Sequence, residues 1–296
     1  MTGRRPAAVS GALVMAGLVF ARALAADVGT AAGALILDDQ PVHLTKAYAR
    51  EEHVIPELDV GDPNPHIAVI LVDRALPDAA TRSEVALVQL ASADTIVGLV
   101  LEIDPATGNV FAGKSFLPGG GNPQFFTQTP ASEKVASDGF KFAAGRASGH
   151  FRTVQPVDVV NQDGTLADSY SFDAAFDTPV VPAPTLLATL TGDRARASEP
   201  ARAIRRYLEA IARGDLAMVR TSLAKDHPLA AMVSVDNLPA IRQEVLGPYD
   251  DARAMMADLQ KAYIYAADAQ LFFKGAQGGT VMPMVLENGV WKVSTP

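Results

Sequence analysis

The 296-residue sequence contains no cysteine. Without cysteine the chain has no disulfide bond, no thiolate metal ligand, no cysteine nucleophile and no lipid-modified cysteine to tether it to a membrane. Basic residues are also in the minority, because 25 lysines and arginines stand against 33 aspartates and glutamates and leave a net charge of −8. Such an acid excess disfavours nucleic acid and anionic lipid surfaces as partners. We therefore expect neither.

Common signatures of metal sites and nucleophilic catalysis are missing as well. No serine lies in the Gly-x-Ser-x-Gly context of a nucleophile elbow. The histidines show no paired spacing typical of metal ligands; they are His43, His53, His66, His150 and His227. The weaker alternative is that His43 and His150 meet across a sheet. The sequence therefore indicates no metal ion and no catalytic serine.

One motif, at residues 108–115, matches the phosphate-loop pattern G-x-x-x-x-G-K-[ST] with the letters GNVFAGKS. In a phosphate loop the lysine is followed at once by a helix whose N-terminus faces the anion. Here Phe116, Leu117 and Pro118 follow, and they do not begin a helix. We expect Lys114 to lie on the arm of a β-hairpin, so the sequence predicts no nucleotide and no other cofactor.

The first residues have the pattern of an export signal. Arg4 and Arg5 precede an apolar run, and residues 23–25, Ala-Leu-Ala, are typical of a cleavage site. The uncharged run spans about 16 residues, short of the roughly 20 that a membrane-spanning helix needs. Removal of residues 1–25 takes away three arginines and no acid, which changes the net charge from −8 to −11. We expect a periplasmic or secreted protein without a stable membrane anchor, exported by the general or the twin-arginine route.

Short β-strands dominate the pattern of residues 26–181. Turn residues separate the predicted strands, which are 33–37, 42–49, 95–103, 108–116, 140–142, 147–154, 157–160 and 169–176. The run 66–73, HIAVILVD, is apolar throughout and predicts a strand buried on both faces at the centre of the sheet. Helical spacing over 78–91 predicts one inserted helix. Together these patterns predict an antiparallel β-sandwich.

A proline-rich stretch divides the chain. Pro179, Pro182 and Pro184 remove backbone N–H groups that a β-ladder needs. We predict a linker at 182–197 between a domain at 26–181 and a second domain at 198–296. An exposed linker predicts tryptic cleavage at Arg194 or Arg196.

Helices come first in the second predicted domain. Ser198 is a good N-cap for a helix that ends at Gly214, and a further helix is predicted at 250–263. The strands 265–273, 280–287 and 290–293 follow. Asn288-Gly289 predicts a type I′ turn, which places Leu286 opposite Trp291 and Met284 opposite Val293. The overall class is therefore α+β.

Two resemblances accompany these patterns. The segments GAL (33–35), VHLTKAYA (42–49), LVDRALP (71–77), LEIDPATG (101–108) and SYSFDAAF (169–176) resemble an uncharacterised family of exported bacterial proteins, which implies a fold and a location but no activity. Residues 198–293, which end in ENGVWKV, resemble the nuclear-transport-factor-two-like fold, a cone-shaped α+β domain. Some domains of that fold use an acid or a histidine inside the cone. Asp268 and His227 are the only matches, and the pattern gives neither a partner.

We expect an exported protein that binds a small molecule or a cell-envelope partner without catalysis. The residues expected to line its ligand pocket are Tyr207, Ile211, Met284 and Trp291. One alternative is a cofactor-free lyase or isomerase in which Asp268 or His227 moves a proton; Tyr207, Tyr263 or Tyr265 would donate a hydrogen bond. The other alternative is a second domain that serves only for homodimerisation through its sheet.

Overall fold

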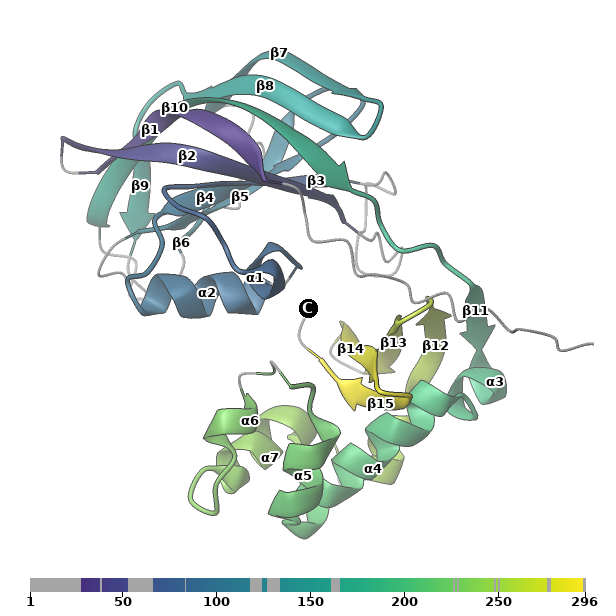
Figure 1. Ribbon diagram of the computed structural model, residues 1–296. Coiled ribbons are helices and arrows are strands. Elements are labelled where there is room, and N and C mark those ends of the chain that lie inside the picture. Colours follow the sequence, from purple (N-terminus) through teal and green to yellow (C-terminus); the bar gives the residue numbers. More distant parts are fainter. Residues whose placement is uncertain are drawn as a thin grey trace, which may run out of the picture.

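The computed structural model describes residues 28–37, 39–52, 66–82, 84–117, 124–126, 134–160, 166–225, 227, 229–247, 249, 251–275 and 278–294. This part of the chain is a mixture of helices and mainly antiparallel strands, arranged in two sheets (Figure 1). The export signal expected at residues 1–25 lies outside the described residues. None of the described helices combines the length and the apolar character that a membrane crossing needs.

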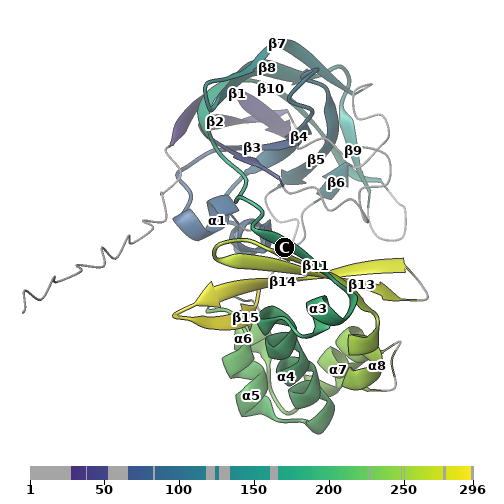
Figure 2. The same cartoon turned by 90° about the vertical axis from the view of Figure 1, so that its right-hand side faces the viewer.

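The first sheet contains ten described strands, which with two helices form the β-rich part of the molecule. The strands are β1 (Gly29–Leu37), β2 (Gln40–Glu51), β3 (Ile67–Val72), β4 (Gly98–Ile103), β5 (Val110–Phe116), β6 (Gln124–Phe126), β7 (Val135–Ala143), β8 (Arg146–Thr153), β9 (Val157–Val160) and β10 (Leu166–Val181). They pair in the order β6-β5-β4-β3-β2-β1-β10-β8-β7, with β9 beside β10. Figure 2 shows that this sheet curls into a half-barrel.

The pairing differs from the two-sheet sandwich that the sequence predicts. The described strands of this part form one continuous sheet, because β10 pairs with β1 and with β8 and so joins the two halves of the part. Alternation and turn residues locate strands and hairpins, but they do not specify partners that lie far apart in the sequence. The correction therefore concerns the layers, whereas most of the strands lie where the sequence predicts them; the short β6 is a strand that the sequence does not predict.

β3 is the strand that the sequence predicts to be buried on both faces, and all six of its residues are buried. Leu71 belongs to the core inside the curl, whereas Ile70 belongs to a second core on the opposite face. Two helices cover that face: α1 (Asp78–Arg82) and α2 (Glu84–Ser92). The prediction of a doubly buried strand is confirmed. The helical spacing over 78–91 locates this helical region correctly, but the structure has two helices here and not the single inserted helix that the sequence predicts.

The second sheet and six described helices form the helix-covered part of the molecule. Its strands are β11 (Ala188–Thr191), β12 (Leu259–Ile264), β13 (Asp268–Gly275), β14 (Gly278–Glu287) and β15 (Val290–Val293), paired in that order. Its helices are α3 (Gly192–Arg196), α4 (Glu199–Arg213), α5 (Leu216–Ser222), α6 (Leu229–Met232), α7 (Leu238–Leu246) and α8 (Ala252–Ala257). The helices lie on one face of the sheet (Figures 1 and 2), and a single apolar core fills the space between them.

Helix α4 begins and ends as predicted. The Ser198 hydroxyl accepts a hydrogen bond from the Ala201 N–H at 3.3 Å, which satisfies one of the free amides of the first turn. Gly214 adopts a left-handed conformation with φ of 75° and stops the helix. Asp215 then caps α5 by accepting from the Met218 N–H at 3.0 Å. Local chemistry therefore fixes both ends of the main helix.

Two local predictions fail in this part. Residues 188–197 of the predicted linker form β11 and α3, because β11 pairs with β12. Ala195 of α3 is fully buried, and Arg196 donates to the Leu259 carbonyl at 3.0 Å, so a tryptic site here loses its physical basis. The helix predicted at 250–263 is only α8, and β12 takes its second half. Residues 182–187 remain without helix or strand, and their Leu187 is 63% exposed.

The C-terminal hairpin follows the predicted turn chemistry. Asn288 and Gly289 have φ of 51° and 77°, the left-handed values that a type I′ turn requires. Leu286 pairs with Trp291, and Met284 pairs with Val293. The predicted register of β14 and β15 is confirmed.

Candidate functional site

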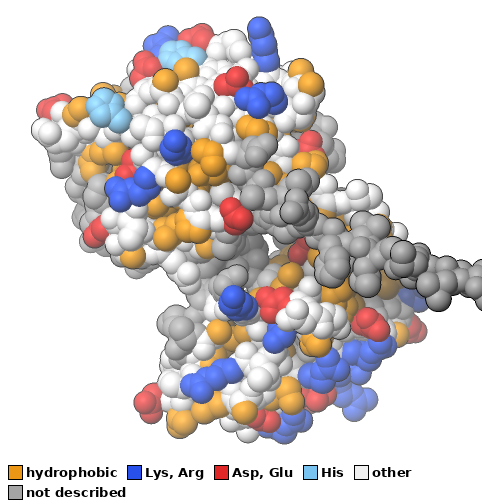
Figure 3. Space-filling model, viewed as in Figure 1, with side chains coloured by type: hydrophobic (Ala, Val, Ile, Leu, Met, Phe, Trp, Pro, Cys, Tyr) orange, Lys and Arg blue, Asp and Glu red, His pale blue; other side chains and the backbone are white. Residues whose placement is uncertain are grey.

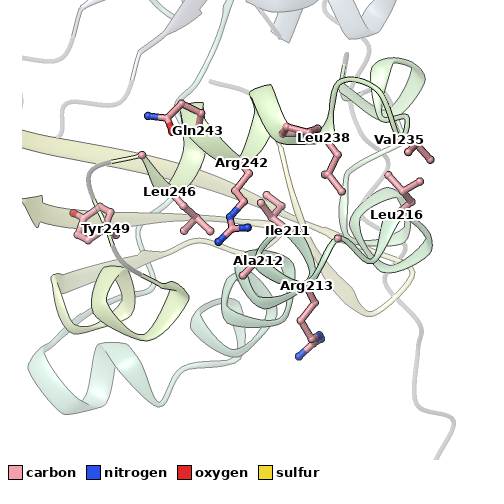
Figure 4. Close-up of a pocket in the computed structure, with 13 residues that line it drawn as sticks. Ile211, Ala212, Arg213, Leu216, Val235, Leu238, Arg242, Gln243, Leu246 and Tyr249 are labelled. Atoms are coloured by element: carbon pink, nitrogen blue, oxygen red, sulfur yellow. The ribbon is translucent and has the colours of Figure 1, made fainter.

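A hollow of about 660 Å³ lies in the helix-covered part, between α4, α5 and α7 (Figure 4). Its apolar lining residues include Ile211, Ala212, Leu216, Val235, Leu238 and Leu246. Its polar lining residues are Arg213, Arg242, Gln243 and Tyr249. The site therefore combines an apolar surface with a small number of polar side chains.

The ends of three helices create this hollow. Gly214 stops α4, so the chain turns into α5 and leaves the last turn of α4 open on one side. In α7, Leu238, Arg242 and Leu246 follow one another at spacings of four residues and therefore share one side of the helix. Pro239 in the first turn of α7 favours a helix start there, because its fixed φ suits the first helical positions. The hollow thus results from where the helices begin and end.

Arg220 holds the segment before α7 in place. Its guanidinium nitrogens Nε and Nη2 donate to the Val233 carbonyl at 3.1 and 2.5 Å. Val233 itself is buried in the core, whereas Val235, two residues later, is 73% exposed at the edge of the hollow. An apolar side chain is therefore presented to solvent at the mouth of the site.

The charge of the hollow comes from arginine. Figure 4 shows the Arg242 side chain extending from α7 toward α4, whereas the Arg213 side chain points away from α7. Nη1 of Arg213 lies 3.6 Å from Oε2 of Glu209. Within the described residues Arg242 has no hydrogen-bond or ion-pair partner, and the described lining contains no aspartate, glutamate or histidine. The hollow therefore carries positive charge.

Tyr249 closes one end of the hollow. Burial, together with a hydrogen bond to the Asp258 carboxylate and its charge, raises the pKa of Tyr249 above the ordinary tyrosine value. The phenol therefore stays neutral at physiological pH. Its ring supplies apolar surface to the wall.

Of the four residues expected to line a ligand pocket, only Ile211 lines the hollow. Tyr207, Ile211 and Met284 lie in the packed core between α4 and the sheet, each at most 2% exposed. Burial, with the nearby charge of Glu244 as a smaller cause, raises the pKa of Tyr207 to about 12. Trp291 is half-buried at the edge of the same core. The structure thus brings these residues together as core.

The two candidate proton shuttles lie in different surroundings. Nδ1 of His227 accepts a hydrogen bond from the Leu229 N–H at 3.1 Å at the start of α6, and burial lowers the pKa of this histidine. Asp268 begins β13 and points to the sheet face opposite the helices, because the next residue, Ala269, belongs to the helix-side core. Burial, and secondarily the charge of Asp268, raises the pKa of Tyr265 on that same face. The structure therefore does not assemble His227 and Asp268 into one site.

The outer face of the second sheet carries an aromatic cluster. Tyr263, Tyr265 and Phe272 form it, with Val281 packed against them. The three aromatic residues are only 5–8% exposed. This cluster therefore does not present a free apolar surface to a second subunit.

The motif that matches a phosphate loop lies on a hairpin arm, as expected. β5 runs from Val110 to Phe116 and pairs with β4, so Lys114 lies inside a strand and the next two residues continue that strand. Nζ of Lys114 lies 3.6 Å from Oε1 of Glu102. His150 contacts Asp173 at 2.6 Å between Nε2 and Oδ1, but no three potential ligands among the described residues are arranged to hold a metal ion.

Sequence reasoning did not identify Arg242, Leu238 or Leu246 as site residues. The signal that could have found them is the spacing of four residues in the segment 238–246, which places one arginine between two leucines on a helix face. The prolines around this segment suggested short, broken pieces instead. No family model, no curated protein and no solved structure matches the chain.

Proposed function

We propose that the protein binds a small molecule in the hollow between α4, α5 and α7, without catalysis. The observation that supports this proposal is the hollow itself, with its volume of about 660 Å³ and its mixture of apolar and polar lining residues. Small-molecule sites typically have volumes of about 300–1,000 Å³ and use a few polar groups to orient the ligand. The volume of the hollow lies in this range.

Binding is preferred to catalysis because of the chemistry of the lining. General acid–base catalysis uses a side chain that gains and loses a proton near the working pH. The described lining residues offer arginine, glutamine and a neutral tyrosine instead. A lyase or isomerase that uses Asp268 or His227 is the weaker alternative, because both lie outside the hollow.

Homodimerisation through the second sheet is the other alternative. It needs an accessible apolar sheet face, whereas the aromatic residues of that face are already buried within the chain. We therefore place the function in the hollow and not on the sheet.

The setting of this function is also proposed. We infer that residues 26–181 form a β-rich domain and that the helix-covered part, to which β11 and α3 also belong, is a nuclear-transport-factor-two-like domain. Helices followed by an antiparallel sheet support the second assignment. The pattern of residues 1–25 supports export to the periplasm or the medium.

The experiment uses N-phenylnaphthylamine, an uncharged probe whose fluorescence increases in apolar surroundings. Ala212 is a partly buried residue in the wall of the hollow, so Ala212→Phe should fill the space and abolish the fluorescence increase. Ala240→Phe is the matched control, because Ala240 is exposed on α7 and does not line the hollow. Equal loss of binding in both variants, or no binding to the parent, would contradict the proposal.

A further inference from the structure

We propose that the natural ligand of the hollow is a monoanionic amphiphile, an apolar molecule that carries one carboxylate or similar anionic head. This inference rests on the proposed function and adds the chemical class of the ligand. Two features support it: the apolar lining residues, and Arg242, which has no ion-pair or hydrogen-bond partner among the residues that the structure describes.

The wall fits an apolar body. Ile211, Leu238 and Leu246 line the hollow but are at most 8% exposed, because they also belong to the core of the helix-covered part. The accessible apolar surface comes from the exposed Val235 and the half-buried Ala212 and Leu216. A ligand that covers these side chains removes their apolar surface from water, which is favourable at roughly 25 cal/mol per Å². Because Val235 lies exposed at the edge, the apolar surface continues from the wall to the mouth of the site.

Arg242 fits an anionic head. A guanidinium presents donors in a fork that matches the two oxygens of a carboxylate. Within the described residues nothing else occupies these donors. Glu209, which contacts Arg213, is not part of the lining. Glu244 lies two residues from Arg242 on α7 but likewise does not line the hollow.

The described lining has two arginines and no acid. A cationic ligand would meet like charge and lose affinity, whereas an anion would gain the guanidinium donors of Arg242. An uncharged ligand would use the wall alone.

The test measures how tightly the full chain binds two fluorescent probes that share one ring system. Anilinonaphthalene sulfonate carries an anionic head, and N-phenylnaphthylamine is the same ring system without it. We expect the parent protein to bind the sulfonate about threefold to tenfold more tightly than the neutral probe. This ratio is modest because Arg242 is exposed, and a charge contact that remains partly in water contributes little binding free energy. Raising the ionic strength should reduce this preference and leave the neutral probe unaffected.

Arg242→Gln should abolish the preference, because it lowers the affinity for the sulfonate probe and leaves the affinity for the neutral probe unchanged. Arg242→Glu should make the neutral probe the tighter binder. Arg194→Gln is the matched control, because Arg194 is an exposed arginine on α3 that does not line the hollow. If both probes bind equally to the parent and Arg242→Gln changes neither, the anionic class is wrong while the proposed binding site stands. If neither probe binds, or if sulfonate binding survives Ala212→Phe, the proposed function and the inference both fail.

Discussion

The two parts of the molecule use their apolar residues in different ways. In the β-rich part, the curled sheet encloses one core and two helices bury a second core on its outer face. In the helix-covered part, one core lies between the helices and the sheet, and the helices beyond it leave a hollow open to solvent. A curled sheet buries the apolar side chains of its inner face. Helix ends that meet at angles leave some apolar side chains accessible to a ligand.

Charge separates the two parts as well. Residues 26–187 contain 21 acidic and 9 basic side chains, a balance of −12, whereas residues 188–296 contain 12 and 13, a balance of +1. Figure 3 shows lysine and arginine side chains gathered over α3 and α4 on the helix-covered part. The excess negative charge of the chain therefore belongs to the β-rich part, and the anion-binding chemistry we propose lies in the part without it.

The largest effect should come from the closed core. Phe151 is fully buried and contacts the rings of Phe140 and Phe176 at centroid distances of 6.0 and 5.8 Å. We expect Phe151→Ala to lower the free energy of unfolding of the β-rich part by about 3–5 kcal/mol, measured by chemical denaturation. Leu246→Ala in the wall of the hollow should cost about 2 kcal/mol, at the low end for leucine, because its surroundings are partly open. Equal losses of unfolding free energy in Phe151→Ala and Leu246→Ala would contradict the contrast between a closed β-rich part and a partly open helix-covered part.

A half-buried residue should have an intermediate effect. Trp291 is half-buried at the edge of the core, opposite Leu286. We expect Trp291→Ala to cost about 2 kcal/mol, less than the roughly 3–5 kcal/mol of a buried tryptophan. The emission of this single tryptophan should be moderately blue-shifted. Emission like that of free tryptophan would contradict the observed register.

Lys292 is the control for that position. It lies on the opposite face of β15, and its Nζ donates to the Thr221 carbonyl at 2.8 Å. We expect Lys292→Ala to cost less than about 1 kcal/mol, because the contact is exposed. A larger cost for Lys292 than for Trp291 would mean that the two faces are exchanged.

Helix caps allow a smaller test inside the helix-covered part. Ser198→Ala removes the hydrogen bond to the Ala201 N–H and should cost about 1 kcal/mol. Thr191, the N-cap of α3, makes no such side-chain bond, so Thr191→Ala should cost a few tenths of a kcal/mol at most through the loss of the cap. Thermal denaturation of both variants provides the comparison, and similar shifts would argue against a role for the Ser198 hydroxyl.

Local chemistry explains which features the sequence predicts. The Ser198 cap, the Gly214 stop and the Asn288-Gly289 turn depend on neighbours along the chain, and all three are found as expected. β11 pairs with β12 and β1 pairs with β10, and these distant partners leave no local signal. The hollow is harder still to predict, because Arg242 acquires its position only when α7 packs beside α4.

The smallest effect should come from two hairpin turns, one in each part. Ala144-Gly145 joins β7 to β8 with φ of 50° and 71°, and Asn288-Gly289 joins β14 to β15 with nearly the same angles. Asparagine tolerates the left-handed conformation better than alanine, because its short polar side chain can bond locally. We therefore expect Ala144→Asn to stabilise the β-rich part by about 0.5 kcal/mol and Asn288→Ala to destabilise the helix-covered part by about as much. Equilibrium denaturation of the two variants should show shifts of opposite sign, and a destabilising Ala144→Asn would mean that the first turn is held by its surroundings and not by its own residues.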